Sequence, residues 1–383
     1  VLDKNLWGGV PFHFWTAVFF VLGSIVGSFL NVCIHRMPLE QSVIRPPSHC
    51  PHCKYSIPWF LNIPLVTWVY LRGKCASCGA PISIRYFLVE LLTAVTFAGC
   101  WLAIGHRSPG VAVVYCLILA GFIAATFIDV EHIIIPDEIT IGGIIVGFLL
   151  SAVVPELHNT GDRGLAMKAS FWGIAVGGGI VYLILRGGKL AFGKEKLQLA
   201  PESKVIFKET ALQLPDKELP YNEIFYRKSD YIQLFAKTAE LADRCYFKTI
   251  ITLKPDLLKI GEEELNPEQV PHMEIVTNEI VLPREAMGFG DVKFMAAIGA
   301  FLGWQAVIFS LMVSAVIGTA VSLGAIAIRR AEWSTRIPYG PYIALAAVIY
   351  MFLSFEMQAA WRDYLSVFTQ LFNQGPAAGA YMR

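Results

Sequence analysis

The stretch "EAMGFGDVKFMAAIGAFLGW", Glu285 to Trp304, places an aspartate at the start of a helix that is otherwise apolar enough for a membrane. Asp291 follows Gly288 and Gly290 and precedes a long run of small and apolar side chains. A charged side chain at the centre of a membrane helix costs about 2.5–3.5 kcal/mol on insertion scales. Asp291 therefore either stays near water or serves a function, and the rest of the chain decides between these readings.

The composition is that of a membrane protein. The 383 residues are 55% hydrophobic and only 16% charged, with a mean hydropathy of +0.54. These values indicate a polytopic membrane protein whose main surroundings are the lipid bilayer. The net charge of +1 and the absence of a Gly-rich phosphate loop argue against nucleic acid as a partner.

Eight segments approach the length of about 20 apolar residues that a helix needs to cross the hydrocarbon core. The sequence thus predicts an all-α polytopic membrane protein of about eight transmembrane helices. The first segment is long and lacks a small-residue cleavage site, so we read it as a true span rather than a signal peptide. The eight segments are 11–33, 85–104, 111–129, 138–154, 169–186, 287–303, 305–328 and 338–355.

Lysine and arginine in the connecting segments predict the orientation. The loop after the first span carries five cations against Glu40, and the loop before the last span carries three against Glu332. By the positive-inside rule both loops are cytoplasmic, which places both termini outside and segments 130–137 and 187–285 in the cytoplasm. The cations are Arg36, Arg45, Lys54, Arg72 and Lys74 in the first loop, and Arg329, Arg330 and Arg336 in the second.

Region 187–285 differs in composition from the rest of the chain. It holds 14 Lys or Arg and 17 Asp or Glu, about half of all charges, so it lies outside the membrane. Alternating stretches such as "KVIFKET" (204–210), "CYFKTIITL" (245–253) and "HMEIVTNEIVL" (272–282) predict short strands. We therefore expect an inserted β-rich cytoplasmic domain.

Four of the eight cysteines form two CxxC pairs, with 21 residues between the pairs. Each pair offers two thiolates, and the four together match a structural tetrahedral zinc site. The loop has too small a core to fold without such a bound metal. The alternative is a redox dithiol, which a cytoplasmic location and two matched pairs disfavour. Neighbouring His49 and His52 are not needed as ligands. The predicted ligands are Cys50, Cys53, Cys75 and Cys78.

Two aspartates are predicted to lie at the same depth. Asp129 closes the span 111–129 and Asp291 opens the span 287–303, both at the cytoplasmic face. Two close carboxylates share a proton, so that one activates water and the other polarises a carbonyl, as in aspartic proteases. Each aspartate has a simpler reading as an interfacial or helix-start residue. Three nearby acids could fill the same catalytic role as Asp129, namely Glu131, Asp137 and Glu138.

Several motifs in this order resemble the bacterial type IV prepilin peptidases, membrane aspartyl proteases of the GxGD type that also act as N-methyltransferases. The motifs are "GSFLNVCIHRMP" (27–38), the double CxxC loop, "ISIRYFLVELLTA" (82–94), "IDVEHIIIPDEIT" (128–140), "GFGDVK" (288–293) and "YGPYIAL" (339–345). The resemblance implies that Asp129 and Asp291 are the catalytic pair. It implies cleavage of prepilin or pseudopilin leaders after a glycine, at the cytoplasmic face of the inner membrane, in a type IV pilus or type II secretion system.

The resemblance also implies methylation of the new amino group with S-adenosylmethionine, although the sequence carries no glycine fingerprint of a soluble methyltransferase. Glu90 is the candidate to orient the methyl donor or the amine, unless it makes a polar contact between helices. Arg36 has a second reading as a headgroup anchor. The candidates for substrate binding are Asn31, Arg36, Gly288, Gly290 and Lys293.

The predicted organisation follows from these assignments, with one departure from the family pattern. The connection before the GxGD helix, usually short, is roughly a hundred residues long here, which suits gating, substrate recruitment or a tolerated insertion. The segments are 1–34, the first span; 35–84, the zinc loop; 85–186, spans two to five; 187–285, the inserted domain; 286–360, the last three spans; and 361–383, the tail.

Two other functions remain open at the level of sequence. A membrane thiol–disulfide protein would use the CxxC pairs and would not need either aspartate. A non-enzymatic scaffold would use the zinc loop and the charged domain to recruit pilus or secretion assembly proteins, and it would process no leader.

Overall fold

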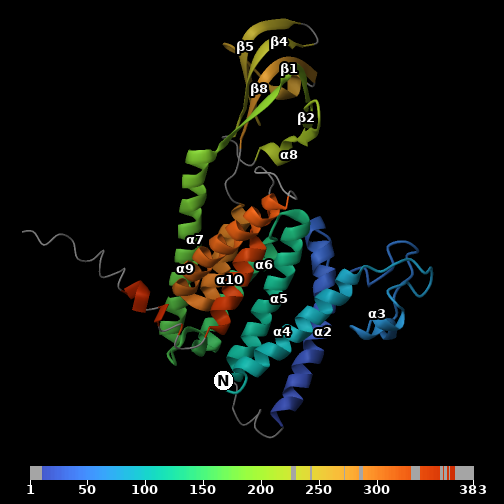
Figure 1. Ribbon diagram of the computed structural model, residues 1–383, viewed down its shortest axis with the longest axis vertical. Helices are drawn as coiled ribbons and strands as arrows, with labels where there is room; N and C mark the ends of the chain where they lie inside the picture. The colour runs from blue at the N-terminus through green and yellow to red at the C-terminus, as the bar shows by residue number, and fades with distance from the viewer. Residues whose placement is uncertain are drawn as a thin grey trace, which may run out of the picture. The chain divides into compact units, whose positions relative to one another are not determined.

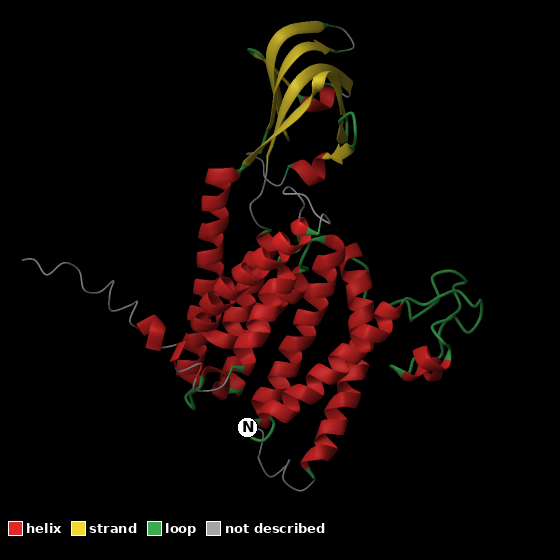
Figure 2. Ribbon diagram, viewed as in Figure 1, coloured by secondary structure: helices red, strands yellow, loops and turns green. Residues whose placement is uncertain are grey.

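The computed structural model describes residues 11–225, 230–241, 244–270, 272–283, 288–328, 337–353, 357, 360–361 and 363–366. Contacts divide the chain into two compact units, Val1–Val181 with Phe289–Arg383, and Tyr182–Gly288. The first unit is built of helices and the second of a β-sheet (Figures 1 and 2). The predicted cations of the second cytoplasmic loop, Arg329, Arg330 and Arg336, and most of the tail 361–383 lie outside the described residues.

Five helices are long and apolar enough to cross a membrane, within the part of the chain that the structure describes. They are α2 (Phe12–Arg36), α4 (Ile84–Ile104), α5 (Pro109–His132), α7 (Arg163–Phe192) and α9 (Phe289–Ala327). Two shorter helices, α6 (Asp137–Val153) and α10 (Gly340–Phe352), fall in other predicted spans. The molecule is therefore helix-rich with several apolar helices, and the number of eight spans stays a prediction.

Two of the predicted spans, 287–303 and 305–328, belong to one element. Helix α9 extends over 39 residues, and Gly303 interrupts its helical backbone with φ 81° and ψ 173°. Glycine adopts this backbone conformation without the steric penalty of a Cβ atom. The element therefore consists of two helical parts that meet at Gly303.

Small residues bring the helices of the first unit into close contact. A Cβ atom at Gly173 of α7 would lie 2.0 Å from the backbone oxygen of Gly299 in α9, so a side chain has no space there. A Cβ atom at Gly23 of α2 would lie 2.6 Å from the Thr93 backbone oxygen in α4. Close backbone approach through small residues is the usual packing of membrane helices, because lipid provides no hydrophobic force between them.

The segment between α2 and α4 contains short elements: η1 (Met37–Leu39), η2 (Trp59–Leu61) and α3 (Val66–Tyr70). A further 3-10 turn, η3 (Pro155–His158), joins α6 to α7.

The second unit contains an eight-stranded antiparallel sheet with the order β3-β2-β1-β8-β4-β5-β6-β7. Its central strands are the longest, since β1 and β8 pair over most of their length. The strands are β1 (Lys194–Lys208), β2 (Ala211–Gln213), β3 (Glu218–Pro220), β4 (Ile232–Glu240), β5 (Cys245–Lys254), β6 (Leu257–Ile260), β7 (Glu263–Leu265) and β8 (His272–Pro283). The short α8 (Tyr221–Ile224) and η4 (Pro267–Gln269) join strands.

Alternation along the strands builds the core of this unit. Val205 and Phe207 of β1 are buried with Met273 and Ile275 of β8, while the residues between them face outward. Residues two apart on a strand share a face, so this pattern gives one buried and one polar face. The three predicted strands fall in β1, β5 and β8, and the β-rich nature of the inserted region is confirmed.

Candidate functional site

Asp129 lies in the last turn of α5 and is only 4% exposed. Its Oδ2 accepts a hydrogen bond of 2.8 Å from the backbone N–H of Gly340, the first residue of α10. The first N–H groups of a helix have no partner within the helix, so they are free to bind a carboxylate. This contact joins the end of α5 to the start of α10.

Asp291 is the third residue of α9 and is also buried, at 7% exposure. Ile135, in the turn between α5 and α6, connects its surroundings to those of Asp129. A Cβ atom at Gly290 would lie 3.4 Å from Ile135 Cβ, and one at Gly340 would lie 3.1 Å from Ile135 Cδ1. Ile135 therefore packs against the glycine beside Asp291 and the glycine bonded to Asp129, and the two acids approach the same turn.

Tyr339 makes a second connection. Its hydroxyl lies 3.0 Å from the hydroxyl of Ser314 in α9, and it is within electrostatic range of Asp291. The adjacent residue, Gly340, donates to Asp129. Tyr339 is thus close to Asp291, and Gly340 is bonded to Asp129, so the start of α10 connects the two acids.

The other acids of this region differ from the two aspartates in being exposed. Glu131 forms an ion pair with Arg85, Asp137 forms one with Lys293, and Glu138 is also exposed. Since a buried carboxylate costs free energy that an exposed one does not, burial distinguishes Asp129 and Asp291 from these acids as the candidates for a functional role.

The residues predicted to bind substrate are distributed around the start of α9. Gly288 is exposed directly before the helix, and Gly290 lies against Ile135. The Lys293 ammonium lies 5.2 Å from the centre of the Phe289 ring and pairs with Asp137.

Asn31 and Arg36, the other two substrate candidates, are both buried in α2. Asn31 donates to the Tyr86 backbone oxygen at 3.0 Å, while its Oδ1 is buried without a hydrogen-bond partner among the described residues. Arg36 donates to the backbone oxygens of Ser42 and Pro46, at 3.0 and 2.8 Å. Arg36 therefore organises the first part of the loop that follows α2.

Glu90 is buried in α4, and its carboxylate interacts both with the loop and with the Ser28 side chain of α2. Its Oε2 accepts a hydrogen bond of 2.7 Å from the backbone N–H of Leu65. A side chain at Gly27 of α2 would lie 2.7 Å from the Glu90 Cα atom, so the two helices are in close contact here. The predicted polar contact between helices is thus present at Ser28, and a backbone N–H group of the loop is a second partner of Glu90.

The four cysteines of the CxxC pairs gather their sulfur atoms within 4.8 Å of one another. The Sγ atoms of Cys50 and Cys78 are 3.9 Å apart, and those of Cys53 and Cys75 are 4.0 Å apart. Four sulfurs at about 2.3 Å from a tetrahedral zinc would be about 3.8 Å from one another. The separations therefore fit a metal ion held by four thiolates.

Each cysteine pair forms the same turn. The N–H of Cys50 donates to the Tyr55 oxygen and that of Cys75 to the Ala80 oxygen, five residues ahead in both cases. The fourth residue after each first cysteine, Lys54 or Gly79, has positive φ. Hydrogen bonds from the backbone N–H groups of Cys78 and Ser77 lower the pKa of the Cys75 thiol to about 6. The turn thus favours the thiolate form of Cys75, which is the form that binds metals, whereas desolvation and the neighbouring cysteine side chains raise the pKa of Cys78 to about 11.

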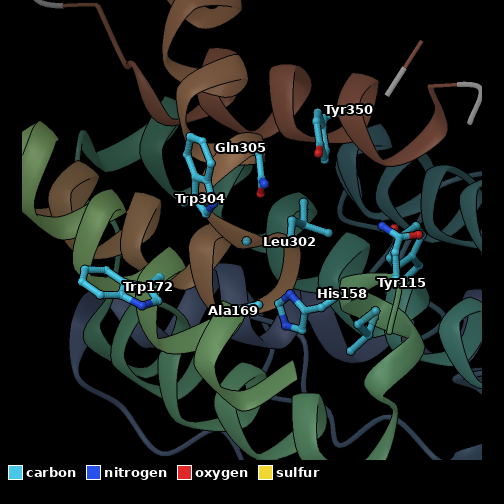
Figure 3. Close-up of a pocket in the computed structure, with 11 residues that line it drawn as sticks. Tyr115, His158, Ala169, Trp172, Leu302, Trp304, Gln305 and Tyr350 are labelled. Carbon is cyan, nitrogen blue, oxygen red and sulfur yellow. The ribbon is translucent and has the colours of Figure 1, made fainter. Parts of the chain in front are cut away.

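A cavity of about 510 Å³ lies elsewhere in the helical unit, at the break in α9. His158, Trp304 and Gln305 are among the side chains around it (Figure 3). Gly303 is twelve residues beyond Asp291, which along a helix is about 18 Å. None of the predicted site residues lines this cavity, so we do not assign the chemistry to it.

Two backbone groups of the site were missed by sequence reasoning. The N–H groups of Gly340 and Leu65, which bond to Asp129 and Glu90, come from segments distant in sequence. The type of a residue does not reveal which side chain its backbone N–H will bond to. The "YGPY" stretch was a signal for the first, because proline within the first turn and glycine beside it predict a helix start with close backbone approach. No comparable signal marks Leu65.

Comparison with known proteins identifies two family models along the chain. The Bacterial Peptidase A24 N-terminal domain matches residues 21–104, and the Type IV leader peptidase family matches residues 116–200 and 271–323. Together they cover more than half of the chain. The second match is interrupted between 200 and 271, where most of the β-sheet lies.

Curated relatives carry one name, "Prepilin leader peptidase/N-methyltransferase". The protein of Aeromonas hydrophila is 27% identical, with 89% of this chain and 91% of the relative covered. That of Myxococcus xanthus is 47% identical over 35% of this chain and 40% of the relative, and that of Dichelobacter nodosus 38% over 41% and 65%. No solved structure matches the chain. With both family models in chain order and relatives aligned over most of their length, the chain belongs to the type IV leader peptidase family.

Proposed function

We propose that this protein removes the N-terminal leader of type IV prepilins or pseudopilins and then methylates the exposed amino group. The names of the relatives support both activities. The observation that carries the peptidase is the pair of buried aspartates, Asp129 and Asp291, whose helix ends approach the same turn at Ile135. Two acids in this arrangement suit peptide hydrolysis by general acid and base.

The aspartates cleave the peptide bond in two steps. The ionised carboxylate takes a proton from water, whose oxygen attacks the scissile carbonyl carbon while the protonated carboxyl donates a hydrogen bond to the carbonyl oxygen. The proton held by the dyad then passes to the amide nitrogen, and the C–N bond breaks. The Gly340 N–H orients Asp129 through Oδ2, and Gly290 presents no side chain beside Asp291.

Methyl transfer is assigned to the region of α2 and α4. S-adenosylmethionine would supply an electrophilic methyl group on a cationic sulfur. Glu90 provides a buried carboxylate, and Asn31 provides a buried amide oxygen that has no hydrogen-bond partner among the described residues. This donor set suits a cation. Glu90 orients the cation or the amine, while Asn31, Arg36, Gly288, Gly290 and Lys293 are assigned to the substrate.

The four cysteines are proposed to hold a structural zinc ion. Their sulfur separations fit the metal, and the loop between α2 and α4 has only short elements of its own. Zinc would fix the two turns and with them the start of α4. The rival redox function needs no fourfold cluster, and the gathering of all four sulfurs therefore favours the metal site.

The proposed setting is the bacterial inner membrane, crossed by about eight helices, with the aspartates toward the cytoplasm. The positive charge of the loop after α2 supports this orientation. In a pilus or secretion system the enzyme would act before subunit assembly, and the assembly proteins are proposed as further contacts.

Mass spectrometry of a prepilin substrate tests this function. The purified protein is incubated with substrate, with and without S-adenosylmethionine. We expect a product truncated after a glycine in both samples and heavier by one methyl group only with the donor. Glu90→Gln should retain truncation and lose the methyl group. An intact substrate in every sample would contradict the peptidase, and truncation without methylation in wild type would contradict the second activity.

A further inference from the structure

The loop between α2 and α4 contains an uncharged segment that is unusual for a water-exposed connection. No Asp, Glu, Lys or Arg occurs from Tyr55 to Leu71, and Lys54, Arg72 and Lys74 flank the segment. The stretch is too short to cross a membrane, since a spanning helix needs about 20 residues. Apolar segments with cationic flanks are typical of chains that lie in the interface of a bilayer.

Several large side chains of this segment are exposed. Trp59 is 81% exposed and Tyr70 is 77% exposed. On α3, Val66, Val69 and Tyr70 are exposed at positions i, i+3 and i+4, which form one helical face. We call the exposed apolar and aromatic side chains of residues 59–70 the aromatic face; they are Trp59, Phe60, Ile63, Val66, Val69 and Tyr70.

The opposite side of the segment is attached to α4 at two places. Leu65 N–H donates to Glu90, and the Trp68 ring lies 5.2 Å from the Phe87 ring. The Trp68 side chain also donates to the Ile82 backbone oxygen at 3.4 Å. The segment is therefore held along the first two turns of α4, and Figure 1 shows α3 beside the region where that helix begins.

These attachments fix the depth of the segment. With 21 residues, α4 is about 31 Å long, the thickness of the hydrocarbon core. Glu90 lies six residues beyond the first residue, Ile84, which is about 9 Å along the helix axis. A segment bonded to Glu90 therefore cannot extend far into water, and its aromatic face is at the level of headgroups and upper acyl chains.

Helix α4 also exposes apolar side chains over its first turns. Ile84, Leu88 and Leu92 are exposed at fourfold spacing on the same helix, as expected for a side that meets lipid. Tryptophan and tyrosine are enriched at the membrane interface because their rings are amphipathic. Cations at Lys54, Arg72 and Lys74 are suited to anionic headgroups.

We propose that residues 59–70 form an interfacial anchor, whose aromatic face is inserted among the lipids of one leaflet while the cysteine turns stay in water. The occupant of this face is lipid, rather than the substrate or a second copy of the chain. The anchor holds the loop flat on the membrane beside Glu90.

Site-directed photocrosslinking in a bilayer tests the anchor. The full chain, in nanodiscs of phosphatidylethanolamine and phosphatidylglycerol and without substrate, carries benzoylphenylalanine in place of Trp59 or of Tyr70. The matched control carries it in place of His52, an exposed residue of the first cysteine turn. After irradiation, mass spectrometry measures the yield of lipid adducts. We expect at least tenfold more lipid adduct at 59 and 70 than at 52.

Three outcomes would overturn the anchor. Lipid yields at 59 and 70 equal to that at 52 would place the aromatic face in water. Adducts only to a second copy of the chain would make it an oligomer contact. If the experiment is repeated with prepilin and the adducts transfer from lipid to the substrate, the face is a docking site for the substrate. A quenching experiment with brominated lipids on wild type and Trp59→Phe gives an independent measure, since only lipid contact at Trp59 makes wild type lose more fluorescence than the variant.

Discussion

At the scale of single residues, two buried acids and the groups that hold them form the proposed catalytic centre. Burial separates Asp129 and Asp291 from the exposed Glu131, Asp137 and Glu138, which the sequence pattern left as equals. Hydropathy places an acid at the end or the start of a span, but burial depends on which distant segments cover it. The covering residues are Ile135 and the Tyr339–Gly340 dipeptide.

Gly340→Ala should reduce leader cleavage by about 100-fold, the order expected when a catalytic group is displaced by about 1 Å. The new Cβ atom would lie 2.8 Å from Asp129 Oδ2 and would push the carboxylate away. Initial cleavage rates in detergent give the measurement. Gly121→Ala in α5 is the control, because nothing lies within 4 Å of its Cβ position. Equal rates in both variants would show that Gly340 does not position Asp129.

At the scale of elements, the cysteine turns are the part most fully predictable from sequence. Two CxxC pairs with a positive-φ position behind each are local features, and local turns follow from residue type and spacing. The contact of Leu65 with Glu90 could not be predicted, because it depends on how the loop folds back on α4. The interruption of α9 at Gly303 could not be predicted from the hydropathy either, because hydropathy shows only an apolar run there.

Metal analysis of the purified protein should give one zinc per chain. Cys75→Ser should remove most of the zinc, since it deletes one of four ligands and leaves three, whereas Cys245→Ser, at an exposed cysteine of β5, should leave the zinc content unchanged. X-ray absorption is expected to show sulfur ligands at about 2.3 Å. Retention of full zinc content in Cys75→Ser would place the metal elsewhere.

Helix packing provides a second test at this scale. Gly173→Ala should destabilise the protein by about 1–3 kcal/mol, the range for overpacking, because its Cβ would lie 2.0 Å from the Gly299 oxygen. Gly179→Ala on the same helix has open space and serves as the matched control. Thermal unfolding in detergent compares the two. A Gly173→Ala variant as stable as the control would mean that α7 and α9 are not in close contact there.

At the scale of the whole molecule, the chain consists of a helical membrane unit and a β-sheet unit inserted into it. Composition alone separated the two, since charges concentrate in 187–285. The sheet order β3-β2-β1-β8-β4-β5-β6-β7 could not be predicted from the sequence, because β1 pairs with β8, about 70 residues later in the chain. Alternation reveals strands, but pairing between distant strands depends on the whole fold.

The fragment 194–283 should fold by itself. It contains its own buried core and all eight strands, so it needs no helix of the membrane unit to cover its apolar side chains. Circular dichroism of the purified fragment should show β-structure, and denaturant unfolding should be cooperative. A soluble but unfolded fragment would show that the sheet depends on the rest of the chain.

The proposed peptidase mechanism requires Asp129 and Asp291 to act as one catalytic unit. The measurement is the rate of leader cleavage by Asp129→Asn, Asp291→Asn and the double variant, with Glu138→Gln, an exposed acid of the same region, as the control. We predict that each single variant loses at least about 1,000-fold in rate, that the double variant loses no more, and that the control remains active, as for residues that act together. Substantial cleavage by either single variant, or losses that multiply in the double variant, would contradict a shared two-aspartate mechanism.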